Sequence, residues 1–235
     1  MSIVIATTTL YTNEDIIRIE LAKQTIRQAT EKYPTIVIDG GSPDEFLREI
    51  ERYGAIVQQE EETGIGNSRR QAIKLAHNLG TQIIAWTEPE KVDYIKNISK
   101  TAQPLLYESD IVIPRRKSLE SYPVFQQLTE EIGNEVWEKL TNIDLDMWFG
   151  PRIWKRELTD YFLDYDGNSW DSIFIPVMNA IIDKKYVSSV TIDYTHPNKQ
   201  REIEEYNPKF YIKRAEQLKS LTDILKEHWN KKKKK

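Results

Sequence analysis

Acidic side chains follow two short apolar runs in the first half of the chain. Asp39 begins an Asp-Gly-Gly-Ser stretch, and Glu88 and Glu90 flank a single proline. A carboxylate at a strand end can accept hydrogen bonds from a nucleobase or ribose, and two carboxylates one residue apart can share Mg²⁺ or Mn²⁺. The structural alternatives are a turn formed by Asp39, and a helix that opens with the Glu pair around Pro89.

Basic side chains lie at the start of an amphipathic segment between these two motifs. Gly64 precedes this segment, and Arg69 and Arg70 fall near its first turn. The N-terminus of a helix carries partial positive charge, so cations there are unfavourable. A phosphate bound at the helix N-terminus would balance the charge of both arginines. The alternative is that both arginines pair with the acidic run at residues 60–62.

Apolar runs alternate with amphipathic stretches and predict the elements that position these side chains. Their β-α-β-α-β-α-β order is typical of a mostly parallel sheet with helices on both faces. Such sheets bind ligands beyond the carboxyl ends of their strands, which predicts a site on that rim. The expected strands are 2–9, 35–39, 55–58 and 81–86, and the expected helices are 14–32, one that begins at 42–45, and 66–79.

The second half is less regular. Strands are expected at 110–113 and 187–194, and helices at 124–140, at 170–182 and from Pro208 onward. The last helix carries an apolar stripe from Tyr211 to Trp229 at spacings of four and three. This stripe predicts a packing face, either against the domain or against a second copy of the chain in a homodimer.

The order and spacing of the motifs resemble those of GT-A fold glycosyltransferases over residues 2 to about 100. The matching pieces are a Thr-rich end of the first strand at Thr7 and Thr8, an Asp-Asp-Gly-Ser-like motif at 39–42, a Gly-x-x-x-Ala-Arg-Asn-like helix start at 64–73, and an Asp-x-Asp-like motif at 88–90. Glu stands for Asp at both ends of the last motif, which lengthens each arm by one methylene.

This resemblance implies a Rossmann-like α/β fold for nucleotide-diphospho-sugar transfer. It divides the chain into one domain over residues 1–205, with a nucleotide-binding half (1–105) and an acceptor half (106–205). A C-terminal amphipathic helix (206–230) and a lysine tail (231–235) follow. The tail is expected to be solvated and disordered.

The resemblance also implies a hexosyltransferase that moves a sugar from a nucleoside-diphosphate sugar to an acceptor hydroxyl, assisted by Mg²⁺ or Mn²⁺. Alternatives are a nucleotidyltransferase, which the lack of a Gly-x-Gly-x-Arg-like loop disfavours, and a non-catalytic scaffold on a degenerate GT-A fold. The donor site would include Thr7, Thr8, Asp39, Gly64, Arg69 and Arg70, and the metal site Glu88 and Glu90.

Residues in the second half complete the implied site. Asp171 would be the general base for the acceptor hydroxyl, and His196 would complete the metal shell. Each also has a structural alternative, as a helix-opening acid and as a core histidine. The acceptor would meet Trp148, Gly150 and Trp170, Lys199 and Arg201 would cover the diphosphate, and Arg115 and Arg116 would face an anionic acceptor or solvent.

Composition excludes several classes of protein. The 235 residues carry a net charge of −4, and −9 without the five C-terminal lysines, which disfavours a general nucleic-acid binder. There is no cysteine, so disulfides, thiolate metal sites and cysteine nucleophiles are excluded. No apolar run reaches the roughly 18 residues of a transmembrane helix, and no signal-peptide pattern is present. A cytoplasmic enzyme is therefore expected.

Overall fold

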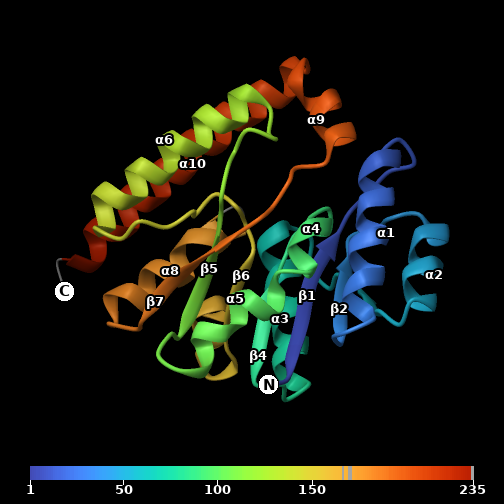
Figure 1. Cartoon of the computed structure of the whole chain (residues 1–235), viewed down its shortest axis with the longest axis horizontal. Helices are drawn as coiled ribbons and strands as arrows, with labels where there is room; N and C mark the ends of the chain where they lie inside the picture. Colours follow the sequence, from blue (N-terminus) through green and yellow to red (C-terminus); the bar gives the residue numbers. More distant parts are fainter. Residues whose placement is uncertain (166, 169–170, 234–235) are drawn as a thin grey trace.

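The structure is a computed structural model that describes residues 1–165, 167–168 and 171–233, with side chains through residue 230. One seven-stranded sheet forms its centre, in the order β3-β2-β1-β4-β6-β5-β7 (Figure 1). All neighbouring strands are parallel except β6, which runs antiparallel to β4 and β5. The strands are β1 (Ile3–Thr9), β2 (Thr35–Asp39), β3 (Ile56–Gln59), β4 (Ile83–Trp86), β5 (Ile111–Arg116), β6 (Arg152–Lys155) and β7 (Val187–Ile192).

Helices cover both faces of this sheet, as the sequence predicts. On one face, α3 and α8 pack on the strands, and α6 and α10 lie outside α8; on the other face lie α1, α4 and α5. The helices are α1 (Ile16–Thr30), α2 (Asp44–Arg52), α3 (Ile65–Asn78), α4 (Val92–Ile95), α5 (Ile98–Ala102), α6 (Val124–Thr141), α7 (Asp160–Leu163), α8 (Asp171–Ile182), α9 (Asn198–Glu205) and α10 (Pro208–Lys233), with 3₁₀ turns η1 (Gln103–Leu106) and η2 (Arg156–Leu158).

The strands β1, β2 and β4 consist of near-continuous Ile, Val, Ala and Thr residues, of which almost all are buried. This composition is typical of parallel strands that are covered on both faces. Their register pairs Thr9 with Asp39 and Ala6 with Trp86. The polar residues that follow these strands therefore meet at one edge of the sheet, where the sequence predicts the site.

The strand β6 was not predicted. It has only four residues, with Arg152 and Lys155 at its ends, and both central residues, Ile153 and Trp154, are fully buried. A buried four-residue segment shows no alternation that would distinguish it from a turn. The helix α9 was also missed, and Pro43 rather than Ser42 is the N-cap of α2.

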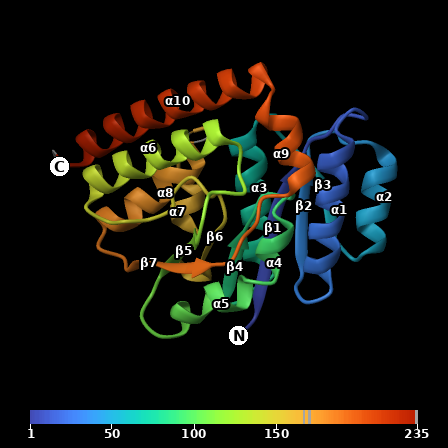
Figure 2. The ribbon, with the colours of Figure 1, turned by 45° about the horizontal axis from the view of Figure 1, so that its top comes forward.

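The C-terminal helix α10 packs along α6 and α8, and α6 and α10 lie side by side (Figures 1 and 2). Leu221 and Leu225 are buried in the main core, and Trp229 packs against it. The predicted apolar stripe is thus a packing face within the chain. The helix continues through Lys233, so the disordered tail predicted from residue 231 is helical there.

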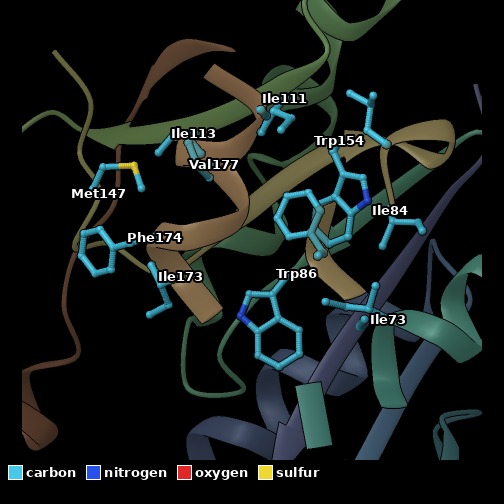
Figure 3. Close-up of a cluster of buried hydrophobic side chains, with 14 of the residues drawn as sticks. Ile73, Ile84, Trp86, Ile111, Ile113, Met147, Trp154, Ile173, Phe174 and Val177 are labelled. Atoms are coloured by element: carbon cyan, nitrogen blue, oxygen red, sulfur yellow. The ribbon is translucent and has the colours of Figure 1, made fainter. Parts of the chain in front are cut away.

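The main core lies between the sheet and the helices α3, α8 and α10. Trp86, Trp154, Ile173 and Phe174 belong to it and come from both halves of the chain (Figure 3). The two halves therefore share one core. None of the helices described is long and apolar enough to span a membrane.

Candidate active site

Two pockets meet beyond the carboxyl ends of β1 and β4. We call the first, of about 530 Å³, the β1 pocket; it lies among the residues after β1, the start of α3 and the residues after β4. The second, of about 250 Å³, is the α10 pocket and lies among α6, α8 and α10. The two pockets share four charged lining residues, Glu88, Glu90, Arg18 and Lys213.

The predicted donor residues Thr8, Gly64 and Arg69 line the β1 pocket. Gly64 is the N-cap of α3 and has φ 118°, a conformation that favours glycine. A Cβ at this position would also overlap the side chain of Asn168. Glycine therefore lets the chain after residue 166 lie directly against the start of α3.

The adjacent arginines Arg69 and Arg70 have different environments. Arg69 is buried, its guanidinium lies 4.9 Å from the centre of the Trp86 ring, and it donates a hydrogen bond to Ser172. Burial lowers the pKa of Arg69 below its ordinary value. Arg70 instead donates to the carbonyl oxygens of Tyr165 and Gly167. Arg69 thus belongs to the pocket, and Arg70 holds the segment before α8.

The Asp39 carboxylate is fully buried and accepts hydrogen bonds from backbone N–H groups of its own turn. Its Oδ1 accepts a hydrogen bond from Thr9 Oγ1 at 2.7 Å, and its Oδ2 accepts from the backbone N–H groups of Gly41 and Ser42, both at 2.8 Å. These contacts support the turn-forming alternative rather than a contact with a base. Thr7 is likewise buried and is not among the residues that line the β1 pocket.

Glu60, which the motif comparison missed, supplies a carboxylate to the β1 pocket. It follows β3, and its Oε2 accepts a hydrogen bond from Ser68 Oγ at 2.7 Å. A Cβ at Gly40 would contact the Glu60 carboxyl at 3.3 Å. The acidic run at 60–62 could have indicated this residue, although nothing in the sequence shows which of the three points inward.

Glu88 lies in the wall between the pockets. Its Oε2 atom is buried and has no hydrogen-bond partner among the described residues. Its charge acts on the buried Arg69 and Arg152, and burial lowers the pKa of Arg152 to about 10. Gly150 has φ 92°, and a Cβ there would overlap the Glu88 carboxylate. Gly150, predicted for the acceptor segment, and Glu88, predicted for the metal motif, are therefore in direct contact.

Glu90 has a different environment. Its Oε1 accepts hydrogen bonds from Tyr11 Oη at 2.9 Å and from Arg18 Nε at 3.0 Å, and Arg18 Nη2 lies 2.8 Å away. Burial and the Glu90 charge raise the pKa of Tyr11 well above its ordinary value, so its hydroxyl remains a donor. For Arg18, burial lowers the pKa, but the interactions with Glu90, Tyr11 and Asp15 together outweigh it, and the net shift is upward.

His196 does not join the two glutamates. Its Nε2 lies 3.1 Å from Glu204 Oε2, and its ring stacks on Tyr122 at 4.4 Å. Within the described part of the chain, no three His, Asp or Glu side chains are grouped so that they could hold a metal by themselves. The predicted set of three protein ligands is therefore not assembled.

Lys199 and Arg201 lie on α9 and line neither pocket. Arg201 donates to Glu205 and to the carbonyl oxygen of Glu120. The cations that do reach the β1 pocket, besides Arg69, are Arg18 and Lys213. Their helices α1 and α10 lie far apart in sequence, which is why motif spacing could not find them.

The α10 pocket contains Trp148, one of the predicted acceptor residues, which packs edge-on against Phe174 at 5.4 Å. Trp148 Nε1 has no hydrogen-bond partner among the described side chains and backbone. Asp171 is buried at the start of α8 and lies close enough to Arg69 for its negative charge to act on the pKa of Arg69. Asp171 is not among the lining residues of either pocket, and the predicted Trp170 falls outside the described residues.

Lys91 brings a cation to the α10 pocket, where three aromatic rings surround it. Its Nζ lies 5.4–5.5 Å from the ring centres of Tyr122, Phe149 and Tyr194. Burial lowers its pKa, but the acidic groups around it, Tyr122, Glu88 and Glu130, together outweigh this effect, and the net shift is upward. Lys91 therefore stays protonated, in a setting where cation–π attraction offsets part of its desolvation.

Arg116 lies behind this pocket and is not free for a ligand, contrary to one prediction. It is buried, makes two hydrogen bonds of 2.7 Å to the Asp146 carboxylate, and its Nη1 lies 2.6 Å from Glu130 Oε2. Arg115, by contrast, pairs with Asp144 at the surface. The buried Arg116 network supports the pocket wall that carries Glu130.

Comparison with solved structures identifies the architecture, although no family model and no curated protein sequence matches the chain. A glucosyl-3-phosphoglycerate synthase from Mycobacterium tuberculosis, in complex with Mn²⁺, UDP-glucose and phosphoglyceric acid, superposes with a TM-score of 0.66 at 14% identity, over 95% of this chain and 80% of that one. The chain has a GT-A fold.

Two further structures support this fold. The same synthase with Mg²⁺ and UDP has a TM-score of 0.61 at 14% identity, over 84% of this chain and 72% of that one. A structure described as a mycobacterial protein has a TM-score of 0.62 at 16% identity, over 84% and 68%. At such identities the likeness establishes the GT-A fold that the motifs predicted, with its mostly parallel α/β sheet.

Proposed function

We propose that the protein is a glycosyltransferase that moves a sugar from a nucleoside-diphosphate sugar to an acceptor hydroxyl. The observation that carries this proposal is the shared wall of Glu88, Glu90, Arg18 and Lys213 between the β1 and α10 pockets. A group transfer needs two substrates whose reacting atoms meet. Two pockets that open on the same four charged side chains offer that arrangement.

The β1 pocket is the proposed donor site. It lies at the carboxyl ends of parallel strands, where sheets of this kind bind nucleotides. Arg18, Arg69 and Lys213 bring three cations to it, which suits a diphosphate. Solved neighbours of the same fold hold UDP or UDP-glucose, so uridine diphosphate is the first nucleotide to test.

The α10 pocket is the proposed acceptor site. Trp148 and Phe174 offer apolar faces to a sugar or another polyol, and Lys91 offers a cation to an anionic substituent. The acceptor oxygen bonds to the anomeric carbon as the bond from that carbon to the diphosphate breaks. Asp171 remains the proposed acceptor of the hydroxyl proton. Because it lines neither pocket, this role requires that the acceptor hydroxyl reach the start of α8, two residues before the pocket-lining Ile173.

A divalent metal fits this site through Glu88. Mg²⁺ is commonly held by one or two carboxylates together with substrate phosphates, and Glu88 Oε2 is a buried oxygen without a hydrogen-bond partner in the described structure. Such an ion would stabilise the negative charge of the leaving diphosphate. The solved neighbours hold Mn²⁺ or Mg²⁺ with their nucleotides.

The deciding experiment measures donor binding and turnover together. The protein is titrated with UDP, GDP, ADP and CDP by calorimetry, with and without Mn²⁺, and is then incubated with the corresponding sugar nucleotides. Release of nucleoside diphosphate is followed in the presence of pools of polyol and hydroxy-acid acceptors. We expect one nucleotide to bind more tightly with Mn²⁺ and its sugar nucleotide to be consumed.

The adjacent arginines provide a matched control. Arg69→Met is expected to weaken the bound nucleotide about tenfold or more, because a charged hydrogen-bond donor to phosphate is lost. Arg70→Met is expected to leave the affinity within about twofold. Nucleotide binding without turnover would favour a non-catalytic protein on this fold, and binding of none of the four nucleotides would contradict the proposal.

A further inference from the structure

Arg18 holds Glu90 at the junction of the two pockets. Two nitrogens of its guanidinium lie 2.8 and 3.0 Å from Glu90 Oε1, and Tyr11 Oη donates to the same oxygen at 2.9 Å. The guanidinium also lies 4.9 Å from the centre of the Tyr11 ring. One carboxylate oxygen therefore already accepts from two residues, and a cation balances its charge.

This arrangement makes Glu90 a poor metal ligand. A divalent ion at Oε1 would have to displace the Tyr11 hydroxyl and come within a few ångströms of a fixed guanidinium, and like charges at that separation repel. Glu88, two residues earlier, has the opposite property, a buried Oε2 without a partner among the described residues. The two halves of the Glu-Pro-Glu motif are thus chemically distinct.

Arg18 is itself placed to meet a ligand. Its side chain is 47% exposed, it lines both pockets, and it is steadied by Asp15 at 3.3 Å in addition to Glu90. Arginine presents several N–H donors in a fixed plane, so two of them can bind one carboxylate while others remain for a phosphate oxygen. Lys213 lines the same two pockets and adds to the positive charge there.

We propose that Glu90 is not a metal ligand but the anchor that fixes Arg18 against the diphosphate, so that Glu88 is the one carboxylate of this motif that holds the metal. This proposal rests on the proposed donor site. It makes Arg18 a diphosphate-binding residue and Glu90 its positioning residue. The site then binds a diphosphate with one metal ion and the Arg18 guanidinium, in addition to Arg69, rather than with a metal bound by both glutamates.

The first test uses Mn²⁺ alone and so does not depend on any nucleotide or transfer activity. Mn²⁺ affinity is measured by electron paramagnetic resonance for the wild type, Arg18→Gln, Glu90→Gln and the double variant. Removing Arg18 frees Glu90, so Arg18→Gln is expected to bind Mn²⁺ at least threefold more tightly than the wild type. The double variant is expected to lose this gain, and Glu90→Gln alone to change the affinity less than twofold.

The second test measures the affinity for the nucleoside diphosphate that the wild type binds, with and without Mn²⁺. Arg18→Gln and Glu90→Gln are each expected to weaken binding about tenfold, by the same factor in both conditions. The double variant is expected to be no weaker than Arg18→Gln, because the two residues act as one unit. Glu88→Gln is expected to abolish the difference that Mn²⁺ makes. Lys23→Gln, which removes a cation of α1 that pairs with Glu20 and Glu49 outside the pockets, is the control.

The outcomes separate this inference from the proposed function. If Glu90→Gln abolishes the effect of Mn²⁺, Glu90 is a metal ligand. If Arg18→Gln binds Mn²⁺ no more tightly than the wild type, Arg18 does not keep Glu90 from the metal. Either result overturns the inference. If these results are as expected but no sugar nucleotide is consumed, the charge arrangement stands and the transferase assignment fails. Variants are compared only where circular dichroism shows an unchanged fold.

Discussion

The two halves of the molecule satisfy their buried charges in different ways. In the first half, Asp39 is bound by the next two backbone N–H groups of its turn and by Thr9 on the neighbouring strand. In the second half, Arg116 is bound by Asp146, 30 residues away, and by Glu130 on α6. The two turn hydrogen bonds of Asp39 therefore follow from local sequence. Its bond from Thr9, also 30 residues away, and the whole Arg116 network exist only once distant elements have packed.

This difference has a functional counterpart. The proposed donor pocket is built chiefly from strand ends and one helix start, whose positions follow from the β-α repeat. The proposed acceptor pocket is built from α6, α8 and α10, and its wall depends on the buried ion network. Variants that remove one charged residue from either half can measure how far the stability and the ligand binding of each pocket depend on that half.

The largest effect is expected for Arg116→Met. Among the described residues, this change leaves Asp146 buried without an ion-pair partner and Glu130 with only Arg214, 3.6 Å away. Removal of one partner from a buried ion pair costs about 3–5 kcal/mol of the free energy of unfolding. Chemical denaturation followed by Trp fluorescence measures it. Arg115→Met is the matched control, because it breaks an exposed pair with Asp144 and is expected to cost at most about 1 kcal/mol. Equal losses in the two variants would contradict the assignment of the network.

Asp39→Ala is expected to have the next largest effect, about 2–3 kcal/mol. It removes the acceptor for one hydroxyl and two backbone N–H groups in a buried turn, and unsatisfied buried donors are costly. The measurement is again equilibrium unfolding, with Asp44→Ala at the exposed start of α2 as the control. A loss of nucleotide affinity in Asp39→Asn at unchanged stability would instead restore the predicted contact with a base.

Gly150→Ala tests the contact between the two halves. The residue has φ 92° and faces Glu88, so a methyl group should strain the backbone by about 1–2 kcal/mol and displace the carboxylate. We expect a modest drop in the unfolding midpoint together with a loss of the Mn²⁺ effect on nucleotide binding. Gly80→Ala, also at positive φ but with open space around it, should reproduce only the stability loss.

The smallest effect concerns pH. Burial lowers the pKa of His196 below its ordinary value of 6.5, so the unfolded chain takes up a proton at a higher pH than the folded chain. Stability should therefore fall as the pH decreases below about 6.5, by at most about 1.4 kcal/mol per pH unit. His196→Phe keeps the stacking on Tyr122 and should flatten the slope of unfolding free energy between pH 5 and 6.5. An unchanged slope would show that the histidine does not control it.

Much of the fold could be predicted because its signals are local. The strands β1 to β4, the helices between them and the long α10 follow from periodicity and from glycine and proline positions. The strand β6 could not be predicted, because four buried residues carry no periodic signal, and its antiparallel direction depends on which neighbours it meets. The predicted parallel orientation is correct for the other strands.

For the site, the sequence by itself determined which types of residue would gather on one rim: glycine at a helix start, arginine beside it, and a pair of glutamates after β4. Strand order and chain direction suffice for this, because parallel strands end at the same edge. Only the tertiary structure decided their roles. It gave Arg69 and Arg70 different environments and placed Arg18 on Glu90, because the charge that a side chain meets depends on elements that are distant in sequence.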